Sequence, residues 1–253
     1  MKLLALVTTI LLSPLGLAME TLAADDDAIA QLRATNRCPG CDLRGANLSG
    51  LDLRGANLFN AKLQGAILRD ADLRSANLYG ANLYVADLFR ANLADANLYE
   101  ANLRYTDLQG ADLRQADLSG ASFARANLRK ADFQDANLFE ANFSEAYLSE
   151  ANFENADLRQ VTFFKANLAD ANFTDANMFA ADLRLANLKG ADFSNANLQA
   201  AILVNTNIAQ AELSNTDLTN ALLQGTEVGP VVCILDQVVN CLVAPTSPAA
   251  PLF

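Results

Sequence analysis

The chain has 253 residues and a formal net charge of −11 at pH 7, from 29 acidic and 18 basic side chains. This balance does not fit nucleic-acid binding through a basic face, which requires clustered Lys and Arg side chains. The sequence contains no histidine, which excludes His-dependent catalytic triads, histidine general bases and the common zinc sites.

Residues 1–23 predict a secretory signal peptide. Lys2 precedes an apolar run over residues 3–12, and small residues follow at Ala23 and Ala24, as in signals with a small-residue cleavage site. We expect cleavage after one of these two alanines. The alternative is an uncleaved membrane anchor, but the apolar run is short for a bilayer span.

A short helix is expected next, over residues 25–34, because acidic residues come first and Ile29 and Leu32 offer an apolar side. The sequence C-P-G-C then places Cys38 and Cys41 close together. In a βαβ context this spacing indicates a thioredoxin-like redox site, but no such context surrounds it. A structural staple is therefore the favoured interpretation.

From Cys41 to about Gln224 the chain repeats a five-residue unit without an insertion or deletion, as in ANLSG, ANLYG and ADLRQ. Every central position from Leu43 to Leu223 is Leu, Phe, Met or Ile, and the residue two positions earlier is usually Ala. An α-helix would scatter these positions around its axis at about 100° per residue. A straight strand would send successive central residues to opposite faces. The chain must instead turn a corner once per repeat, which predicts a solenoid.

The remaining positions of the repeat fit such corners. Asn or Asp stands before most central residues, for example at Asn47 and Asp72, and its short side chain bonds nearby backbone groups in turns. The fourth and fifth positions vary freely in type, which is typical of solvated positions. Glycine is frequent at the fifth position early in the run, as at Gly45 and Gly80, where it is expected to serve the turn.

The A-[DN]-L-x-x run resembles the pentapeptide-repeat proteins, and it covers most of the chain. The resemblance implies an all-β solenoid over residues 41–229, a right-handed quadrilateral β-helix with four repeats in each square coil. At about 4.8 Å per coil, about nine coils make a rod about 45 Å long. Central Phe residues would form two facing ladders, whose extra volume predicts local bulging over residues 123–195.

A β-solenoid leaves an open sheet edge at each end, so caps are expected there. Residues 24–40, which include the predicted helix, would form the N-terminal cap. Residues 230–243 would form the C-terminal cap, because they are rich in apolar residues and include a cysteine pair. The Pro-rich tail over residues 244–253 is expected to be disordered.

The four cysteines lie at or beyond the two ends of the implied rod. The Cα atoms of a disulfide lie within about 7 Å of each other, so the several coils between the ends exclude pairing across the rod. The same distance excludes one zinc site built from all four cysteines. If the protein is exported, we expect Cys38 to pair with Cys41 and Cys233 with Cys241.

An aromatic row is expected on one outer wall, because its members recur at multiples of the coil length implied by the resemblance. The row is broken by Ser119 and Arg159. Its members are Phe59, Tyr79, Tyr99, Phe139 and Phe179. Such a row can dock a partner, or its rings can simply stack between coils.

A second wall is expected to be solvated and self-neutralising. It carries basic side chains in its first half and acidic side chains further along and beside them. The residues are Arg54, Arg74, Arg114, Glu154, Asp95, Asp135 and Asp175.

The sequence offers no catalytic residue, no cofactor site and no metal site, and we expect no enzyme activity. Carboxylates recur throughout because the second position favours Asn or Asp, so a pair of them indicates little. The spacing of these residues matches neither an EF-hand nor the glycine-rich calcium repeats.

Two functions from different classes remain. The first is a non-enzymatic structural or protein-interaction scaffold, exported to the periplasm or thylakoid lumen, as the resemblance implies. Its partner is expected to be a protein, not nucleic acid, and no stable membrane insertion is expected once the signal is cleaved. The oligomeric state stays open.

The alternative is a DNA mimic that inhibits a topoisomerase such as DNA gyrase, as some acidic proteins of the resembling family do. B-DNA carries one charge per about 1.7 Å, hence about 26 charges over 45 Å. The net charge of −11 is much smaller, and an exported protein would not meet gyrase. The scaffold is therefore favoured.

Overall fold

Helix α1 (Asp26–Thr35) opens the part of the chain that this computed structural model describes, residues 25–226. Asp25 caps the helix, because its side chain accepts a hydrogen bond from the Asp27 N–H at 3.0 Å. The helix expected over residues 25–34 is therefore confirmed, with a shift of one residue. The predicted signal peptide, C-terminal cap, Cys233–Cys241 pair and tail lie outside the described residues.

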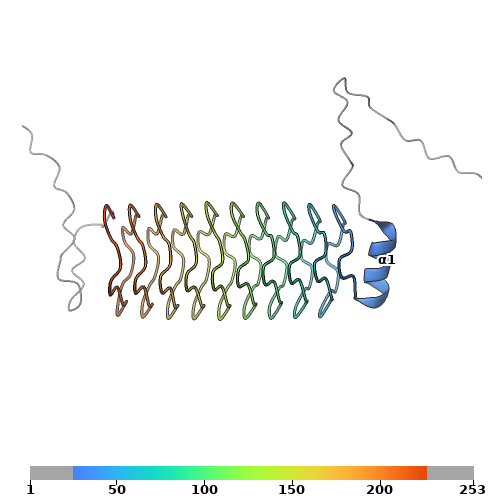
Figure 1. Cartoon of the computed structure of the whole chain (residues 1–253), viewed down its shortest axis with the longest axis horizontal. Helices are drawn as coiled ribbons and strands as arrows, with labels where there is room; N and C mark the ends of the chain where they lie inside the picture. Colours follow the sequence, from blue (N-terminus) through green and yellow to red (C-terminus); the bar gives the residue numbers. More distant parts are fainter. Residues whose placement is uncertain (1–24, 227–253) are drawn as a thin grey trace, which may run out of the picture.

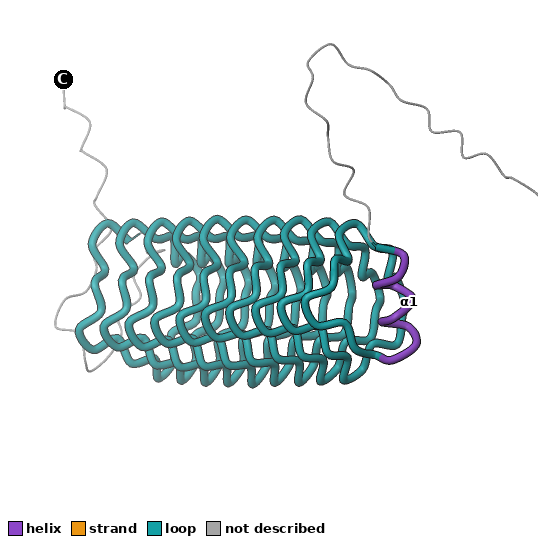
Figure 2. Tube along the Cα trace, turned by 45° about the vertical axis from the view of Figure 1, so that its right-hand side comes forward, coloured by secondary structure: helices purple, strands orange, loops and turns teal. Residues whose placement is uncertain are grey.

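Helix α1 lies at one end of a stack of coils (Figures 1 and 2). Its Ala28 and Leu32 side chains are buried in the same apolar core as the coils. The Asp25 N–H donates to the Asp42 carbonyl at 3.2 Å, and the Asn36 side-chain amide donates to the Arg54 carbonyl at 2.7 Å. The helix and its flanks thus satisfy carbonyl groups that the first coil would otherwise leave open.

The coils are held by parallel bridges between residues twenty apart, from Arg37↔Asn57 to Ile202↔Leu222. The bridges are isolated single residues, so the repeat forms very short bridged segments joined by turns. Around Leu78 the pattern is complete: its N–H donates to the Asn97 carbonyl at 2.7 Å, and the Asn77 N–H donates back to the Ala56 carbonyl at 2.8 Å. The solenoid predicted from the five-residue period is confirmed.

The twenty-residue spacing of the bridges divides the repeats among four walls. Wall 1 has Leu43 and every twentieth residue after it at its centre; walls 2, 3 and 4 start in the same way from Leu48, Leu53 and Leu58. The fourth and fifth residues of each repeat form the turn into the next wall. Corner 1 is the column of fifth residues after wall 1. Its members are Gly45, Gly65, Val85, Tyr105, Arg125, Glu145, Lys165, Leu185, Asn205 and Gly225.

The core consists of the central residues and the alanines that precede them, nearly all fully buried. Within a wall, successive Phe rings stack face to face, with centroids 4.7 Å apart for Phe123 and Phe143. Across the interior they meet edge to face, as for Phe133 and Phe143 at 5.7 Å. Parallel bridges continue through residues 123–195, so the volume of the rings does not interrupt the backbone ladder; local bulging of the coils there stays a prediction. The two ring arrangements fill the interior together, and both are favourable for aromatic pairs.

Asn and Asp side chains form the turns as predicted. In the repeat at Asn77, for example, the side-chain oxygen accepts from the Tyr79 N–H at 3.1 Å. The fifth position, however, is not free: every fifth residue from Gly40 to Gly225 has a positive φ, in the left-handed region. Glycine adopts this conformation without a steric cost, which explains its frequency there. Residue type thus varies at this position as expected, whereas the backbone conformation is the same in every repeat.

The expected disulfide between Cys38 and Cys41 is present, with Cα atoms 5.3 Å apart. Cys38 is fully buried at the first coil. Further along, Thr replaces the usual Ala at Thr106 and Thr206, and each buried hydroxyl donates to a carbonyl three residues earlier, at 2.6 and 2.8 Å. These departures from the repeat therefore leave no hydroxyl unsatisfied in the core.

Candidate interaction surfaces

The predicted aromatic row lies on wall 4, and its first part is a column of stacked rings. Phe59 stacks on Tyr79 with centroids 5.3 Å apart, and Tyr79 stacks on Tyr99 at 5.2 Å. Ser119 then interrupts the row; its hydroxyl donates to the Asp117 carboxylate at 2.6 Å. The stacking interpretation therefore describes this half of the row, where each ring covers its neighbours.

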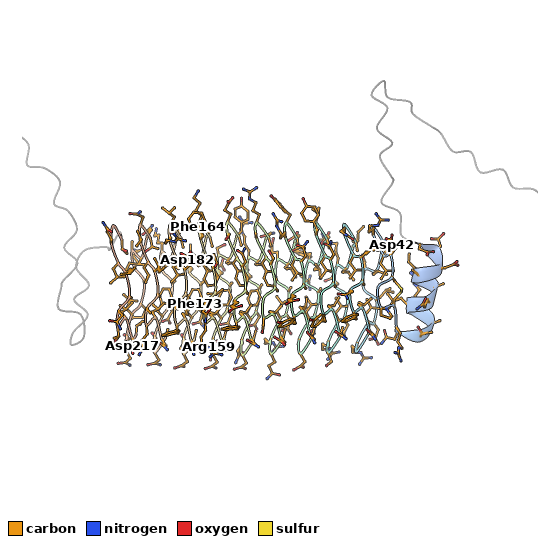
Figure 3. All side chains as sticks on the ribbon, viewed as in Figure 1. Asp42, Arg159, Phe164, Phe173, Asp182 and Asp217 are labelled. Atoms are coloured by element: carbon orange, nitrogen blue, oxygen red, sulfur yellow. A yellow bond between two sulfur atoms is a disulfide. The ribbon has the colours of Figure 1, made fainter. Side chains whose placement is uncertain are left out.

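The second half of the row is not stacked. The Arg159 guanidinium lies 5.4 Å from the centroid of the Phe139 ring, in cation–π range. Phe179 is exposed, and it stacks on no other aromatic ring within residues 25–226. Figure 3 shows Arg159 near the lower edge of the rod, away from Phe164 of wall 1. Docking on this row stays a proposal.

The expected neutralisation of wall 3 holds for its first half. Arg54, Arg74 and Arg114 each form a two-pronged ion pair with the aspartate two residues earlier, with the closer atoms 2.6 Å apart. Arg114 also approaches Asp132 at 3.7 Å. Beyond that point the sequence of wall 3 and its corner contains no Lys or Arg up to Asn215. The second half of this wall is therefore acidic and not self-neutralising, which corrects the prediction.

These ion pairs have a sequence signal that the prediction did not use. Each Asp-Leu-Arg triplet of the repeats forms the same fork, because the second and fourth residues of a repeat project outward beside each other. The pairs are Asp42–Arg44, Asp52–Arg54, Asp72–Arg74, Asp112–Arg114, Asp157–Arg159 and Asp182–Arg184. Hydrogen bonding by Arg54 lowers the pKa of Asp52 to about 2, and Arg114 likewise lowers the pKa of Asp112.

The forks predict a loss of stability in acid. A carboxyl whose pKa is lower in the folded than in the unfolded chain stabilises the fold above the unfolded value of about 3.9, and this contribution disappears as the pH falls through the folded value. Asp112→Asn keeps the turn acceptor but loses the ion pair. We expect it to cost about 0.2–1 kcal/mol at pH 7, because the pair is partly solvated, and clearly less at pH 2.

The measurement is thermal unfolding of both proteins at pH 7 and pH 2. Asp192→Asn is the matched control, because Ser194 replaces the arginine in that repeat. Equal losses for Asp112→Asn and Asp192→Asn at pH 7 would contradict a contribution from the fork.

Charge is distributed unequally around the rod. Walls 3 and 4 with their corners hold fifteen acidic and four basic side chains. The acidic ones are Asp52, Asp72, Asp95, Glu100, Asp112, Asp117, Asp132, Asp135, Glu140, Glu154, Asp157, Asp175, Asp192, Glu212 and Asp217. The basic ones are Arg54, Arg74, Arg114 and Arg159.

Wall 1 with its corner has the opposite balance, six basic and three acidic side chains. The basic ones are Arg44, Lys62, Arg104, Arg125, Lys165 and Arg184, and the acidic ones are Asp42, Glu145 and Asp182. A positive strip therefore runs along a chain that is acidic as a whole, which sequence composition alone does not reveal.

Most of the exposed large apolar side chains gather beside this strip. They lie on walls 1 and 2 and at the corner between them, a surface that the sequence prediction missed. The residues are Ile67, Tyr84, Val85, Tyr105, Tyr147, Leu185 and, in the last described coil, Leu222. The sequence does contain this pattern, but it becomes visible only when the fifth residues, and not just the central and fourth residues, are compared at intervals of twenty.

A shallow pocket of about 600 Å³ opens in the middle of this surface, between Tyr105 and Tyr147. Arg125 forms part of its lining and donates to the Glu145 carboxylate at 2.9 Å and to the Tyr105 hydroxyl at 2.8 Å. Lys165 lies on the other side of Glu145 along corner 1 and also lines the pocket. The pocket thus combines aromatic rings with two cations and one paired carboxylate.

Neither a membrane-spanning helix nor a metal centre is found in residues 25–226. The single helix there is too short and too polar to cross a bilayer. No group of three or more potential metal-ligating side chains comes together in the same part of the chain.

Comparison with known proteins gives a consistent result. The family model described as "Pentapeptide repeats (8 copies)" matches five segments of the chain, residues 37–74, 66–104, 106–144, 141–178 and 186–225. Among solved structures, the chain is similar to HetL, a pentapeptide repeat protein involved in heterocyst differentiation regulation from the cyanobacterium Nostoc sp. strain PCC 7120. The identity is 32%, the alignment covers 81% of this chain and 96% of HetL, and the TM-score is 0.65.

A second similar structure is trypsin-treated QnrB1, a plasmid-mediated fluoroquinolone resistance protein. Its identity is 23%, with 72% of this chain and 89% of that one covered and a TM-score of 0.53. At this identity the likeness shows the fold alone. No curated protein sequence matches the chain.

Proposed function

Since the chain belongs to the pentapeptide-repeat family, we propose that it is a non-enzymatic scaffold that binds another protein outside the cytoplasm. The observation that carries the proposal is the difference in side chains between the interior and the surface. The interior is filled by Leu, Phe and Ala side chains, whereas apolar and charged side chains form ordered columns on the outside. Such columns on a rigid rod favour recognition of an extended partner surface.

The similarity to HetL supports this class of function. HetL is described as involved in the regulation of heterocyst differentiation, and regulation by binding requires no catalytic group. Both the wall 4 aromatic row and the surface around corner 1 are candidate contact areas, because exposed apolar patches on soluble proteins commonly mark interaction sites.

Export to the periplasm or thylakoid lumen is part of the proposal. It is supported by the signal-like sequence of residues 1–23 and by the Cys38–Cys41 disulfide, since disulfides persist in oxidising compartments. The proposal also includes a right-handed coil, about nine coils at about 4.8 Å spacing, and a cap formed by residues 230–243. Leu213 and Leu223 in the last described coil are only half-buried, which favours a further cover there.

The test combines localisation with partner capture. Mature protein is purified from fractionated cells and its N-terminus is sequenced; we expect a start just after Ala23 or Ala24. Affinity capture from the same fraction should then retain a reproducible protein partner. Retention in the cytoplasm with Lys2 intact would overturn export, and the absence of any partner together with no phenotype on deletion would overturn the scaffold.

The DNA-mimic alternative gains one observation, the concentration of negative charge on walls 3 and 4. The fifteen acidic and four basic side chains there give a net charge of −11 on half of the surface. This is still less than half of the about 26 charges of a duplex of similar length. A supercoiling assay with purified mature protein separates the two functions. Inhibition of gyrase at submicromolar concentration would replace the scaffold proposal.

A further inference from the structure

Corner 1 carries side chains that its backbone conformation disfavours. All fifth positions are left-handed, and the φ values of Val85, Tyr105 and Leu185 are 59°, 60° and 61°. For residues with a Cβ this region is sterically unfavourable, and for a β-branched residue such as valine it is a clear outlier. Glycine, asparagine and aspartate tolerate it best.

Polar and small residues with a Cβ, such as Arg90 and Ala180, adopt this conformation at the other corners too, but large apolar residues in it are confined to corner 1 and to its middle. Corner 1 begins with Gly45 and Gly65 and ends with Asn205 and Gly225, which suit the conformation. From 85 to 185 it contains none of the tolerant residue types. The other three corners hold no Val, Leu, Ile, Phe or Tyr at a fifth position within the described coils.

Folding gains little from these side chains. Val85 is 50% exposed and Leu185 45%, against 0% for most core residues. Tyr105 meets Tyr84 edge to face at 5.6 Å and accepts a hydrogen bond from Arg125 at 2.8 Å, but both contacts are with other surface side chains and neither is with the core. Every fifth position adopts the left-handed conformation, so what the fold does not require at corner 1 is the choice of large apolar residues. Costly residues kept at exposed positions occur at functional sites, which points to a role outside the monomer.

The chemistry of the corner indicates what it binds. Arg125 and Lys165 lie two coils apart between apolar side chains at both ends, with Glu145, which is paired with Arg125, between them. Arg104 and Arg184 of wall 1 lie beside them, and Arg184 is paired with Asp182, so the surface keeps a net positive charge. Five coil steps from Val85 to Leu185 span about 24 Å, the length of about seven residues of extended chain. An elongated surface of this kind fits a peptide segment better than a small molecule.

Resting on the proposed scaffold function, we propose that corner 1 and its flanking rings dock an extended segment of a partner protein that carries carboxylates between apolar side chains. The carboxylates face Arg125 and Lys165, and the apolar side chains cover Val85, Tyr105 and Leu185. The pocket between Tyr105 and Tyr147 receives one side chain of the segment. Charge complementarity distinguishes this surface from walls 3 and 4, which would repel the same segment.

The test uses a corner variant in which Val85, Tyr105 and Leu185 are replaced together (Val85→Asn, Tyr105→Asn, Leu185→Asn). The matched control makes the same change at fifth positions of other corners (Gln115→Asn, Ala180→Asn, Ala200→Asn). Because asparagine suits the left-handed conformation, both variants should keep or raise the melting temperature. A decrease of the melting temperature only in the corner variant would show that these side chains serve folding, and would overturn the proposal.

Binding is measured by selection from a random library of displayed peptides on the full-length mature protein. We expect enriched peptides with Asp or Glu between apolar residues. Their Kd should rise at least tenfold for the corner variant, should change less than twofold for the control, and should rise with salt concentration. Enrichment of basic peptides, no enrichment, or equal binding to the corner variant would each overturn the site.

Failure here is distinguishable from failure of the scaffold function. A native partner that is captured equally by wild type and corner variant supports a scaffold and overturns corner 1 as its site. Sedimentation of the purified protein tests a further possibility. If wild type associates with itself as its concentration rises and the corner variant does not, a second copy of the chain binds corner 1. That result would overturn binding of a partner segment.

Discussion

Replacing Leu108 with aspartate is expected to destabilise the rod by at least about 5 kcal/mol, the combined effect of a lost core side chain and an unpaired buried charge. Leu108 is fully buried in wall 2. The buried hydroxyl of Thr106 in the same repeat already donates to the Leu103 carbonyl, and the core provides no cation to pair with an introduced carboxylate. Neighbouring coils depend on one another for burial, so the lesion should open the middle of the rod and expose it to protease. Chemical unfolding and limited proteolysis measure the two effects.

The control for this variant is Leu108→Met, which conserves volume and should cost less than about 1.5 kcal/mol. The charge makes a further difference: burial raises the pKa of the introduced carboxyl, so its folded-state value lies above its unfolded value. The penalty should therefore shrink as the pH falls and the carboxyl takes up a proton. A Leu108→Asp protein as stable as Leu108→Met at pH 7 would contradict a dry, continuous core.

Replacing Phe153 with alanine is expected to cost about 3–5 kcal/mol. The ring stacks on Phe133 at 4.8 Å and on Phe173 at 5.0 Å, and it meets Phe143 edge to face at 6.0 Å. Since ladders above and below hold the coil spacing, the surrounding coils cannot collapse into the space, and a cavity should remain. The free energy of unfolding from denaturant titration tests this directly.

Phe179→Ala is the matched control, because the same side chain is removed from an exposed position on wall 4. We expect a change within about 0.5 kcal/mol. If the two alanine variants lost similar stability, the assignment of central positions to the core and fourth positions to the surface would be wrong.

The sequence predicts the interior of this protein well. A perfect five-residue period places every central Leu and the Ala before it at the same axis. A side chain such as Asn77 accepts its hydrogen bond from a backbone N–H of its own repeat. These features depend on local geometry, so they can be derived without knowing which coil lies next. The Cys38–Cys41 disulfide can also be predicted from the sequence, because it joins residues that are three positions apart.

The outer surface was harder to predict because its pattern depends on residues twenty apart. Val85, Tyr105 and Leu185 look like unrelated variations in the linear sequence and form one column only after the coils are stacked. Their left-handed backbone cannot be inferred from residue type, because variable residue types indicate a solvated position and carry no information on φ. Similarly, the acidic second half of wall 3 becomes visible only when its residues are sorted by wall. Arg114 is the last basic residue on that wall, and only acidic charges follow it.

This separation between interior and exterior has a functional consequence. Backbone groups of each coil bond to the coils on either side, and the central side chains are committed to the core. Variation without loss of the fold is possible mainly at the second, fourth and fifth positions. Recognition must therefore be encoded in columns at these positions, and a column that works against the backbone preference is the strongest candidate.

Capture of the native partner by three forms of the mature protein tests the central claim most directly. The forms are wild type, the corner variant, and a wall 4 variant with Tyr79→Ser, Tyr99→Ser and Phe179→Ser. We predict that wild type and the wall 4 variant retain the same partner and that the corner variant, although folded, does not. Loss of the partner from the wall 4 variant alone, or equal retention by all three forms, would contradict the assignment of binding to corner 1.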